Sequence, residues 1–125
     1  MGRILKAIRI GNRDWWTLFD SGAGHSYITR RAAAGLDLQP LLTPRRSMLG
    51  GSTHEVTHVC LVQASVDGHP LEFQASVIDE IGQDEDARVI DVLFGAIAMQ
   101  LWGIRLDSQN EVLDLSHFTR DFLEF

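Results

Sequence analysis

An acidic residue stands where an apolar strand is expected to end and a glycine-rich turn to begin. Trp16, Leu18 and Phe19 favour a strand with a bulky buried face, and Asp20 follows them directly. A carboxylate at the rim of a core can serve as a general base or acid, because burial and neighbouring groups move its pKa. Gly22 lets the backbone turn tightly and approach a bound molecule. Asp20 is therefore the first candidate for catalysis, with a plain Asp-Ser-Gly turn as the ordinary alternative.

A second candidate for chemistry is the run His54-Glu55-Val56-Thr57-His58, which matches the His-Glu-x-x-His pattern of zinc peptidases. That pattern needs a helix, which places residues i and i+4 side by side with the glutamate next to a metal-bound water. The glycines before the run and the apolar Val59-Cys60-Leu61-Val62 after it favour a strand. In a strand, residues four apart lie roughly 13 Å from each other. A zinc peptidase is therefore the weaker enzymatic alternative, and we expect neither a metal nor a cofactor.

The composition is that of an ordinary folded domain and restricts the class of partner. The 125 residues suit one domain, expected to span 1–125, and 45% hydrophobic against 22% charged residues is typical of globular chains. A formal net charge of −6 argues against a nucleic-acid partner, because phosphate binding needs clustered lysine and arginine. The first ten residues lack the apolar stretch of a signal peptide or membrane span, which predicts a cytoplasmic protein without a membrane partner. Cys60, the only cysteine, is expected to be buried.

Strands and tight turns are expected along most of the chain. The strand patterns, separated by turn-forming residues, cover 3–10, 15–19, 26–28, 47–49, 53–66, 71–78, 89–94 and 111–115. Two short helices are expected, one over 30–34 after a Thr29 cap and one over 96–102 with Ile97 and Leu101 on one face. Residues 36–43 are interpreted as a connector and 79–86 as an exposed acidic loop. Many short strands of this kind predict an all-β barrel or sandwich.

Several segments, in chain order, resemble the retropepsin-like aspartic proteases, most closely their single-domain bacterial or retrotransposon-type members. Asp20-Ser21-Gly22-Ala23 is similar to the family's catalytic loop, with Asp20 as the catalytic residue and Ser21, Gly22 and Ala23 as support. Leu49-Gly50-Gly51-Ser52 falls where the family has its substrate-binding flap, and Leu93-Phe94-Gly95 resembles the strand that threads behind the loop. The resemblance implies a closed barrel, a symmetric homodimer and hydrolysis of polypeptides. Ala96 is a departure, because relatives often carry Asp, Asn or Arg there.

The chemistry of that family needs two carboxylates that share one proton, because adjacent like charges cannot both ionise. This chain supplies one aspartate in the required setting. Asp67-Gly68 lacks the intervening hydroxyl residue, Asp107-Ser108-Gln109 lacks the glycine, and Asp91-Val92-Leu93 lacks both. Twofold symmetry would bring Asp20 of one chain against Asp20 of another. Ser21 is then expected to hydrogen-bond the opposing loop and hold the two carboxylates coplanar.

Other functions of the same fold stay open. A catalytically inactive dimer that only binds peptides would carry the same sequence features. His25 lies just past the loop, where it is a candidate for contacting substrate or tuning Asp20. In relatives the terminal strands pair across the dimer, and a similar interface is expected for the apolar tail residues Phe118, Phe122, Leu123 and Phe125.

Overall fold

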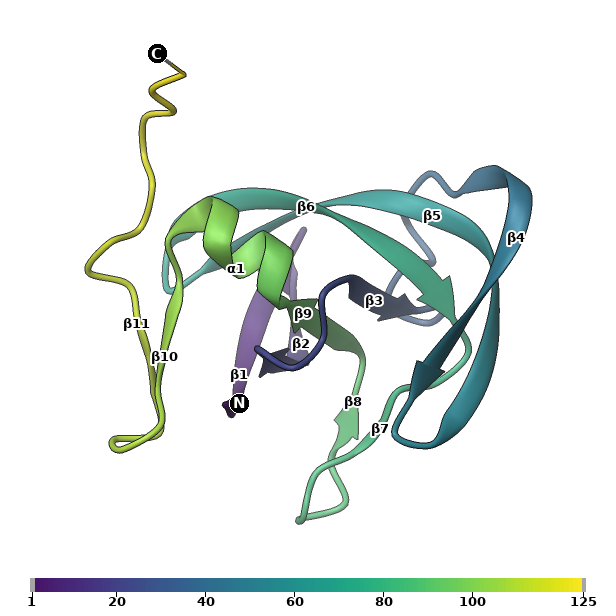
Figure 1. Cartoon of the computed structure of the whole chain (residues 1–125), viewed down its shortest axis with the longest axis horizontal. Helices are drawn as coiled ribbons and strands as arrows, with labels where there is room; N and C mark the ends of the chain where they lie inside the picture. The colour runs from purple at the N-terminus through teal and green to yellow at the C-terminus, as the bar shows by residue number, and fades with distance from the viewer. Residues whose placement is uncertain (1, 125) are drawn as a thin grey trace.

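Strands dominate the computed structural model, which describes residues 2–124 (Figure 1). The largest sheet has seven strands: β1 (Arg3–Ile10), β2 (Arg13–Asp20), β3 (Ser26–Thr29), β4 (Gln39–Leu49), β5 (Ser52–Val66), β6 (His69–Ile78) and β9 (Val92–Gly95). Two small antiparallel pairs join β7 (Gly82–Gln83) to β8 (Val89–Ile90) and β10 (Arg105–Asp107) to β11 (Val112–Asp114). One helix, α1 (Ala96–Trp102), follows β9 directly in the described part of the chain. No helix within residues 2–124 has the length and apolar character needed to cross a membrane.

The order of strands in the large sheet is β1-β2-β9-β3-β6-β5-β4. β9 thus lies between β2 and β3, parallel to the first and antiparallel to the second, although the chain joins β2 to β3 directly. The segment 21–25 must therefore cross the end of β9. The sheet curves strongly in Figure 1, and the pair Arg9–Ser65 connects β1 to β5. The sequence predicted a closed barrel, and the pairings show a curved sheet in which this one residue pair links those two strands.

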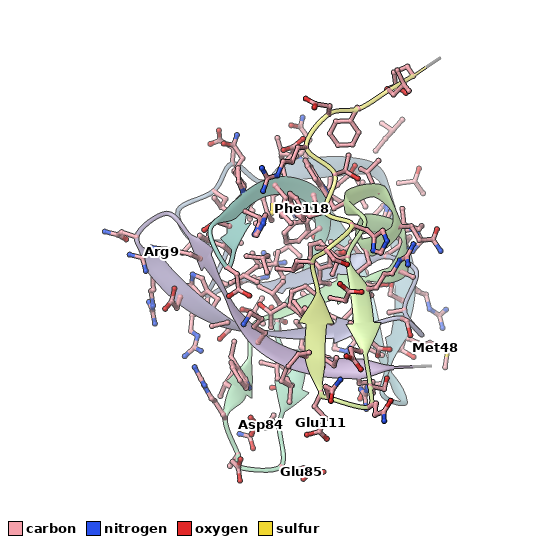
Figure 2. All side chains as sticks on the ribbon, turned by 90° about the vertical axis from the view of Figure 1, so that its left-hand side faces the viewer. Arg9, Met48, Asp84, Glu85, Glu111 and Phe118 are labelled. Atoms are coloured by element: carbon pink, nitrogen blue, oxygen red, sulfur yellow. The ribbon has the colours of Figure 1, made fainter. Side chains whose placement is uncertain are left out.

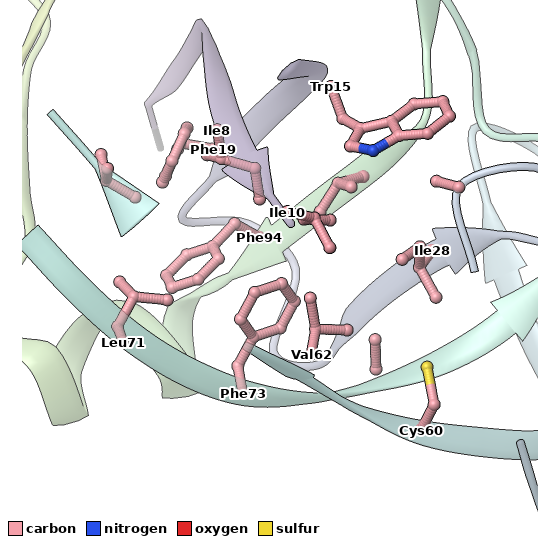
Figure 3. Packing of buried hydrophobic residues seen from close by; sticks show 14 of the residues in the cluster. Ile8, Ile10, Trp15, Phe19, Ile28, Cys60, Val62, Leu71, Phe73 and Phe94 are labelled. Atoms are coloured by element: carbon pink, nitrogen blue, oxygen red, sulfur yellow. The ribbon is translucent and has the colours of Figure 1, made fainter. Parts of the chain in front are cut away.

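Two apolar clusters cover the two faces of the inner strands. Successive side chains of a strand point to opposite faces, so Phe19 belongs to one cluster and Leu18 to the other. Phe94 packs against Phe19 and Phe73 in the first cluster, with ring centroids 5.0 and 4.8 Å apart (Figure 3). The second cluster consists of Leu18, Tyr27, Val56, Ile78, Ile90 and Leu93. Burial on both faces explains why β2 and β9 are apolar without interruption near their ends.

Most predicted strands and turns are confirmed. β1 and β2 form the opening hairpin, and β2 ends at Asp20. Gly50 and Gly51 both have positive φ, +54° and +82°, and form the two-residue turn that joins β4 to β5. Cys60 is buried, and burial raises the pKa of its thiol. The helix over 96–102 is present as α1.

Other elements differ from the prediction. Residues 30–34 form turns instead of a helix: Thr29 Oγ1 accepts the predicted cap bond from the Ala32 N–H at 3.3 Å, but so short a segment gains too few bonds to continue as a helix. The connector 36–43 is partly strand, because β4 begins at Gln39 and shifts register between Pro40 and Arg45. Proline lacks an N–H, which explains irregular pairing there.

The predicted strand 89–94 also needs correction, and the predicted apolar face of α1 points outward. Asp91 interrupts the strand and divides it into β8 and β9. On α1, Met99 and Trp102 point into the core, whereas Ile97 is 60% exposed and Leu101 56%. The apolar face predicted for this helix is thus a surface that its own chain leaves uncovered.

Candidate active site

Asp20 lies at the end of β2, between strands β1 and β9. The sheet register pairs it with Arg3 on one side and with Gly95 on the other. Its side chain is 16% exposed, so the carboxylate stands at the rim of the core, as the sequence predicted. Oδ1 accepts a hydrogen bond from the Gly22 N–H at 2.8 Å, and the Ala23 N–H donates to the Asp20 carbonyl at 3.2 Å. These bonds fold residues 20–23 into a tight turn.

The turn and the residues after it rest on the junction between β9 and α1. The Ala96 N–H donates to the Ala23 carbonyl at 2.6 Å, and the Ile97 N–H donates to the Gly24 carbonyl at 3.1 Å. A Cβ atom on Gly95 would lie 2.3 Å from the His25 carbonyl oxygen, a separation that no side chain tolerates. The crossing of the loop over β9 therefore requires glycine at position 95.

Ser26 completes this support, and sequence reasoning did not find it. Its hydroxyl accepts a hydrogen bond from the Gly95 N–H at 3.0 Å, and its side chain is buried. Of the other predicted supporting residues, Phe94 lies in the first cluster and Leu93 in the second, on either face of β9. The sequence around Ser26 does not predict its bond to Gly95, because Gly95 lies 69 residues further along the chain.

Two residues at the start of β1 also contact the loop and were not predicted. Arg3 Nε lies 3.4 Å from Asp20 Oδ2, and the Arg3 side chain is 68% exposed. The Ser21 N–H donates to the Gly2 carbonyl at 3.0 Å. The Ser21 hydroxyl accepts a hydrogen bond from the Gly2 N–H at 2.7 Å and lies 3.3 Å from the Gly2 carbonyl. Ser21 is thus bonded within its own chain.

The predicted flap is the end of the long β4–β5 hairpin. Gly50, Gly51 and Ser52 are exposed at the turn, and Met48 just before it is 76% exposed and marks the hairpin end in Figure 2. Leu49 packs against the second cluster, as Ala23 does. The hairpin end and the Asp20 loop therefore share one apolar cluster.

The zinc motif lies within a strand, near its beginning. His54, Glu55 and His58 all belong to β5, so the helical geometry that the motif requires is missing. The His58 Nδ1 is within 2.8 Å of the Thr57 hydroxyl. Within residues 2–124, no three or more His, Cys, Asp or Glu side chains gather where they would hold a metal ion.

Asp91 is a second carboxylate in the interior, at the opposite end of β9 from Gly95. It accepts hydrogen bonds from the Thr29 hydroxyl at 2.6 Å and from the Arg31 guanidinium at 2.5 Å. The hydrogen bond and the negative charge of Asp91 raise the pKa of Arg31. The Asp91 side chain is only 4% exposed, and its bonds to Thr29 and Arg31 hold the turns after β3 against the core.

The apolar tail packs on its own chain. Phe118 stacks on Trp102 with centroids 5.6 Å apart, and Phe122 meets the same indole edge-on at 5.1 Å. Leu123 is 89% exposed, and Phe125 lies outside the described residues. The described tail has no strand after β11, and a pairing of terminal strands between chains stays a prediction.

A curved sheet that carries an Asp-Ser-Gly-Ala loop across the end of an inner strand is the architecture of a retropepsin-like aspartic protease. The chain belongs to the aspartyl protease family, whose sequence profile matches residues 7–97. This range contains the Asp20 loop, the β4–β5 hairpin and Gly95. No curated protein matches the chain in sequence.

Solved structures show the same fold at low sequence identity. The retroviral protease-like domain of Ddi1 from Leishmania major is similar with a TM-score of 0.66 and 16% identity, over 94% of this chain and 91% of that one. The EIAV protease, solved with the inhibitor HBY-793, has a TM-score of 0.60 and 17% identity, over 85% of this chain and 93% of that one.

Proposed function

We propose that this protein is an aspartic endopeptidase whose catalytic dyad consists of Asp20 from each of two identical chains. The observation that carries the proposal is the placement of Asp20: a partly exposed carboxylate at the end of β2, in a turn fixed by backbone bonds and by the β9–α1 junction. No other aspartate of the chain has the Asp-Ser-Gly setting. One chain therefore supplies half of a dyad.

In this mechanism the two carboxylates share one proton. The ionised carboxylate takes a proton from a water molecule as the water oxygen attacks the peptide carbonyl carbon, while the protonated one donates to the carbonyl oxygen. Collapse of the tetrahedral intermediate transfers a proton to the leaving amine and restores the shared proton. The rigid 20–23 turn keeps the carboxylate in place, which is the main contribution of the chain to positioning.

The surface next to the loop supports pairing of two chains. Ile97 is 60% exposed and its N–H bonds to Gly24, so an uncovered apolar side chain lies directly beside the catalytic loop. Position 96 is alanine, where relatives often carry a polar residue, so the contact between the two chains at this position is apolar in the proposed dimer. In this arrangement the β4–β5 hairpins act as flaps over an extended peptide, whose backbone pairs with strand edges.

Cleavage of a peptide library by the wild type and by Asp20→Asn, at acidic and neutral pH and with or without a chelator, tests the proposal. We expect Asp20→Asn to lower the rate by about 10²–10⁴-fold, because it removes the acid–base pair. Unchanged cleavage by Asp20→Asn would rule out the aspartic mechanism, and loss of cleavage with chelator would revive the zinc alternative. Peptide binding without cleavage at any pH would support the inactive binding module.

A further inference from the structure

The hydrogen-bonding groups at the centre of the catalytic loop are occupied by the loop's own chain. Gly2 is bonded to Ser21 in three ways. Its carbonyl accepts from the Ser21 backbone N–H at 3.0 Å and from the Ser21 hydroxyl at 3.3 Å, and its N–H donates to that hydroxyl at 2.7 Å. Of the two Asp20 oxygens, Oδ1 accepts from the Gly22 N–H and Oδ2 faces the Arg3 guanidinium at 3.4 Å. Residues 2 and 3 thus contact both residues that the dyad depends on.

The same segment is confined from its other side. A Cβ atom on Gly2 would lie 3.0 Å from Ser108 Oγ and 3.1 Å from Leu106 Cδ1. Leu106 belongs to β10, and Ser108 begins the turn toward β11. Gly2 is therefore held between the Asp20 loop and the β10–β11 hairpin, where a larger residue requires the Leu106 and Ser108 side chains to move by a few tenths of an ångström.

These contacts compete with the assembly of a dyad. In the proposed dimer, Ser21 bonds to the opposing loop, which needs the same hydroxyl that Gly2 now occupies. A hydroxyl has one hydrogen to donate, so it cannot serve the Gly2 carbonyl and an opposing acceptor at once. In the proposed dimer the Asp20 carboxylates share a proton, and the Arg3 guanidinium, 3.4 Å from Asp20 Oδ2, competes for that oxygen.

We propose that Gly2 and Arg3 form an intrachain latch that keeps the single chain latent and has to leave the loop before two chains pair. The inference rests on the proposed function, and it names the regulation of that site. Each chain must release its own latch. The apparent dissociation constant of the dimer therefore rises with the inverse square of the unlatched fraction, and a tenfold change in that fraction changes it about 100-fold.

Sedimentation equilibrium of the full chain, with no substrate present, measures this effect. The variants are Gly2→Val, which crowds the Leu106 and Ser108 side chains and so pushes residue 2 away from them, and Arg3→Ala, which removes the ion pair without enlarging any side chain. Arg9→Ala is the matched control, because Arg9 is an exposed arginine of the same strand that pairs with Asp14 far from the loop. Amide hydrogen exchange at Ser21, whose N–H bonds to Gly2, reports on release of the latch directly.

We expect Gly2→Val to speed amide exchange at Ser21 and to lower the dissociation constant of the dimer at least tenfold. Arg3→Ala should lower this constant as well, and Arg9→Ala should leave it unchanged. Dimers that are equally tight or weaker in both latch variants would overturn the latch, as would chains that stay monomeric after the latch is removed. If Asp20-dependent cleavage is observed and the latch variants do not change dimer affinity, the latch is wrong and the proposed protease function is supported. If the latch variants dimerise more tightly but neither they nor the wild type cleave peptides, the latch is supported and the proposed protease function is wrong.

Discussion

Gly95 determines where Asp20 lies, although the two residues are far apart in the sequence. The loop after Asp20 crosses β9 at Gly95, with the His25 carbonyl oxygen in the space of the missing side chain. Adding one methyl group there forces either the loop or β9 to move. Backbone atoms fill this space, so no side-chain rotation can relieve the overlap.

We expect Gly95→Ala to lower the free energy of unfolding by about 3 kcal/mol and to abolish activity, because the crossing is overpacked. Chemical denaturation measures the first effect and peptide cleavage the second. Gly35→Ala is the control: nothing lies within 4 Å of its Cβ position, and its stability should stay within about 0.5 kcal/mol of the wild type. Equal stability of both variants would contradict the crossing as described.

Individual residues of the site were predictable only where the motif is local. Asp20, Gly22 and Gly95 could be identified because their residue types follow from a turn and a strand end that the sequence shows. Gly2 and Ser26 could not, because their partners, Ser21 and Gly95, lie 19 and 69 residues away along the chain. Nothing in the local pattern of a glycine before a strand specifies such a contact.

Among the elements, strands were predicted better than helices and chain connections. Alternating or continuous apolar runs determine β1, β2 and β6, because one or both faces of each strand are buried. The segment 30–34 was predicted as a helix from its alanines, yet its own Arg31 bonds to Asp91, and Ala32 and Ala33 are buried in the first cluster. Asp91 likewise breaks the predicted strand 89–94, since it faces Thr29 and Arg31.

The acidic segment around β7 and β8 gives a prediction about pH. Asp84 has a lowered pKa, chiefly because the Arg88 N–H donates to its carboxylate at 2.9 Å, with the Trp16 indole N–H donating at 2.8 Å. A carboxylate whose folded-state pKa is lowered stabilises the fold above its unfolded pKa, and this stabilisation is lost as pH falls through the folded value. We therefore expect the segment to loosen below about pH 4.

Amide exchange at Arg88, measured from neutral to acidic pH, follows this loosening. Asp84→Asn should make the segment loose already at neutral pH, because the neutral amide is a weaker acceptor for all three N–H donors. Asp86→Asn is the matched control, since only its backbone N–H takes part in this network. A protection factor at Arg88, corrected for the intrinsic pH dependence of exchange, that does not change with pH would show that the Asp84 bonds contribute nothing to the order of this segment.

In the proposed dimer, the exposed side of α1 has a function. The sequence predicted Ile97 and Leu101 on one apolar face, and the fold turns that face outward next to the Asp20 loop. A buried charge at such an interface costs several kcal/mol unless it is paired. In the proposed dimer, apolar surface that a single chain leaves exposed to water is buried.

We expect Ile97→Glu to weaken the dimer at least tenfold, because it places a carboxylate in the apolar contact, and to leave the thermal stability of the monomer unchanged. Sedimentation equilibrium and thermal unfolding at low concentration make the comparison. Gln100→Glu introduces the same charge on an exposed position of α1 and should not affect dimerisation. If both variants weaken association equally, net charge is responsible and the Ile97 contact is not.

A mixing experiment tests most directly whether Asp20 acts in pairs from two chains. A fixed amount of wild-type protein is incubated with an equal amount of Asp20→Asn protein under conditions in which dimers exchange, and cleavage is measured against wild type alone. If each active site needs Asp20 from both chains, about half of the wild-type chains acquire an inactive partner and the activity falls by about half. A larger excess of Asp20→Asn lowers it further. Full wild-type activity at every ratio would contradict a dyad shared between chains.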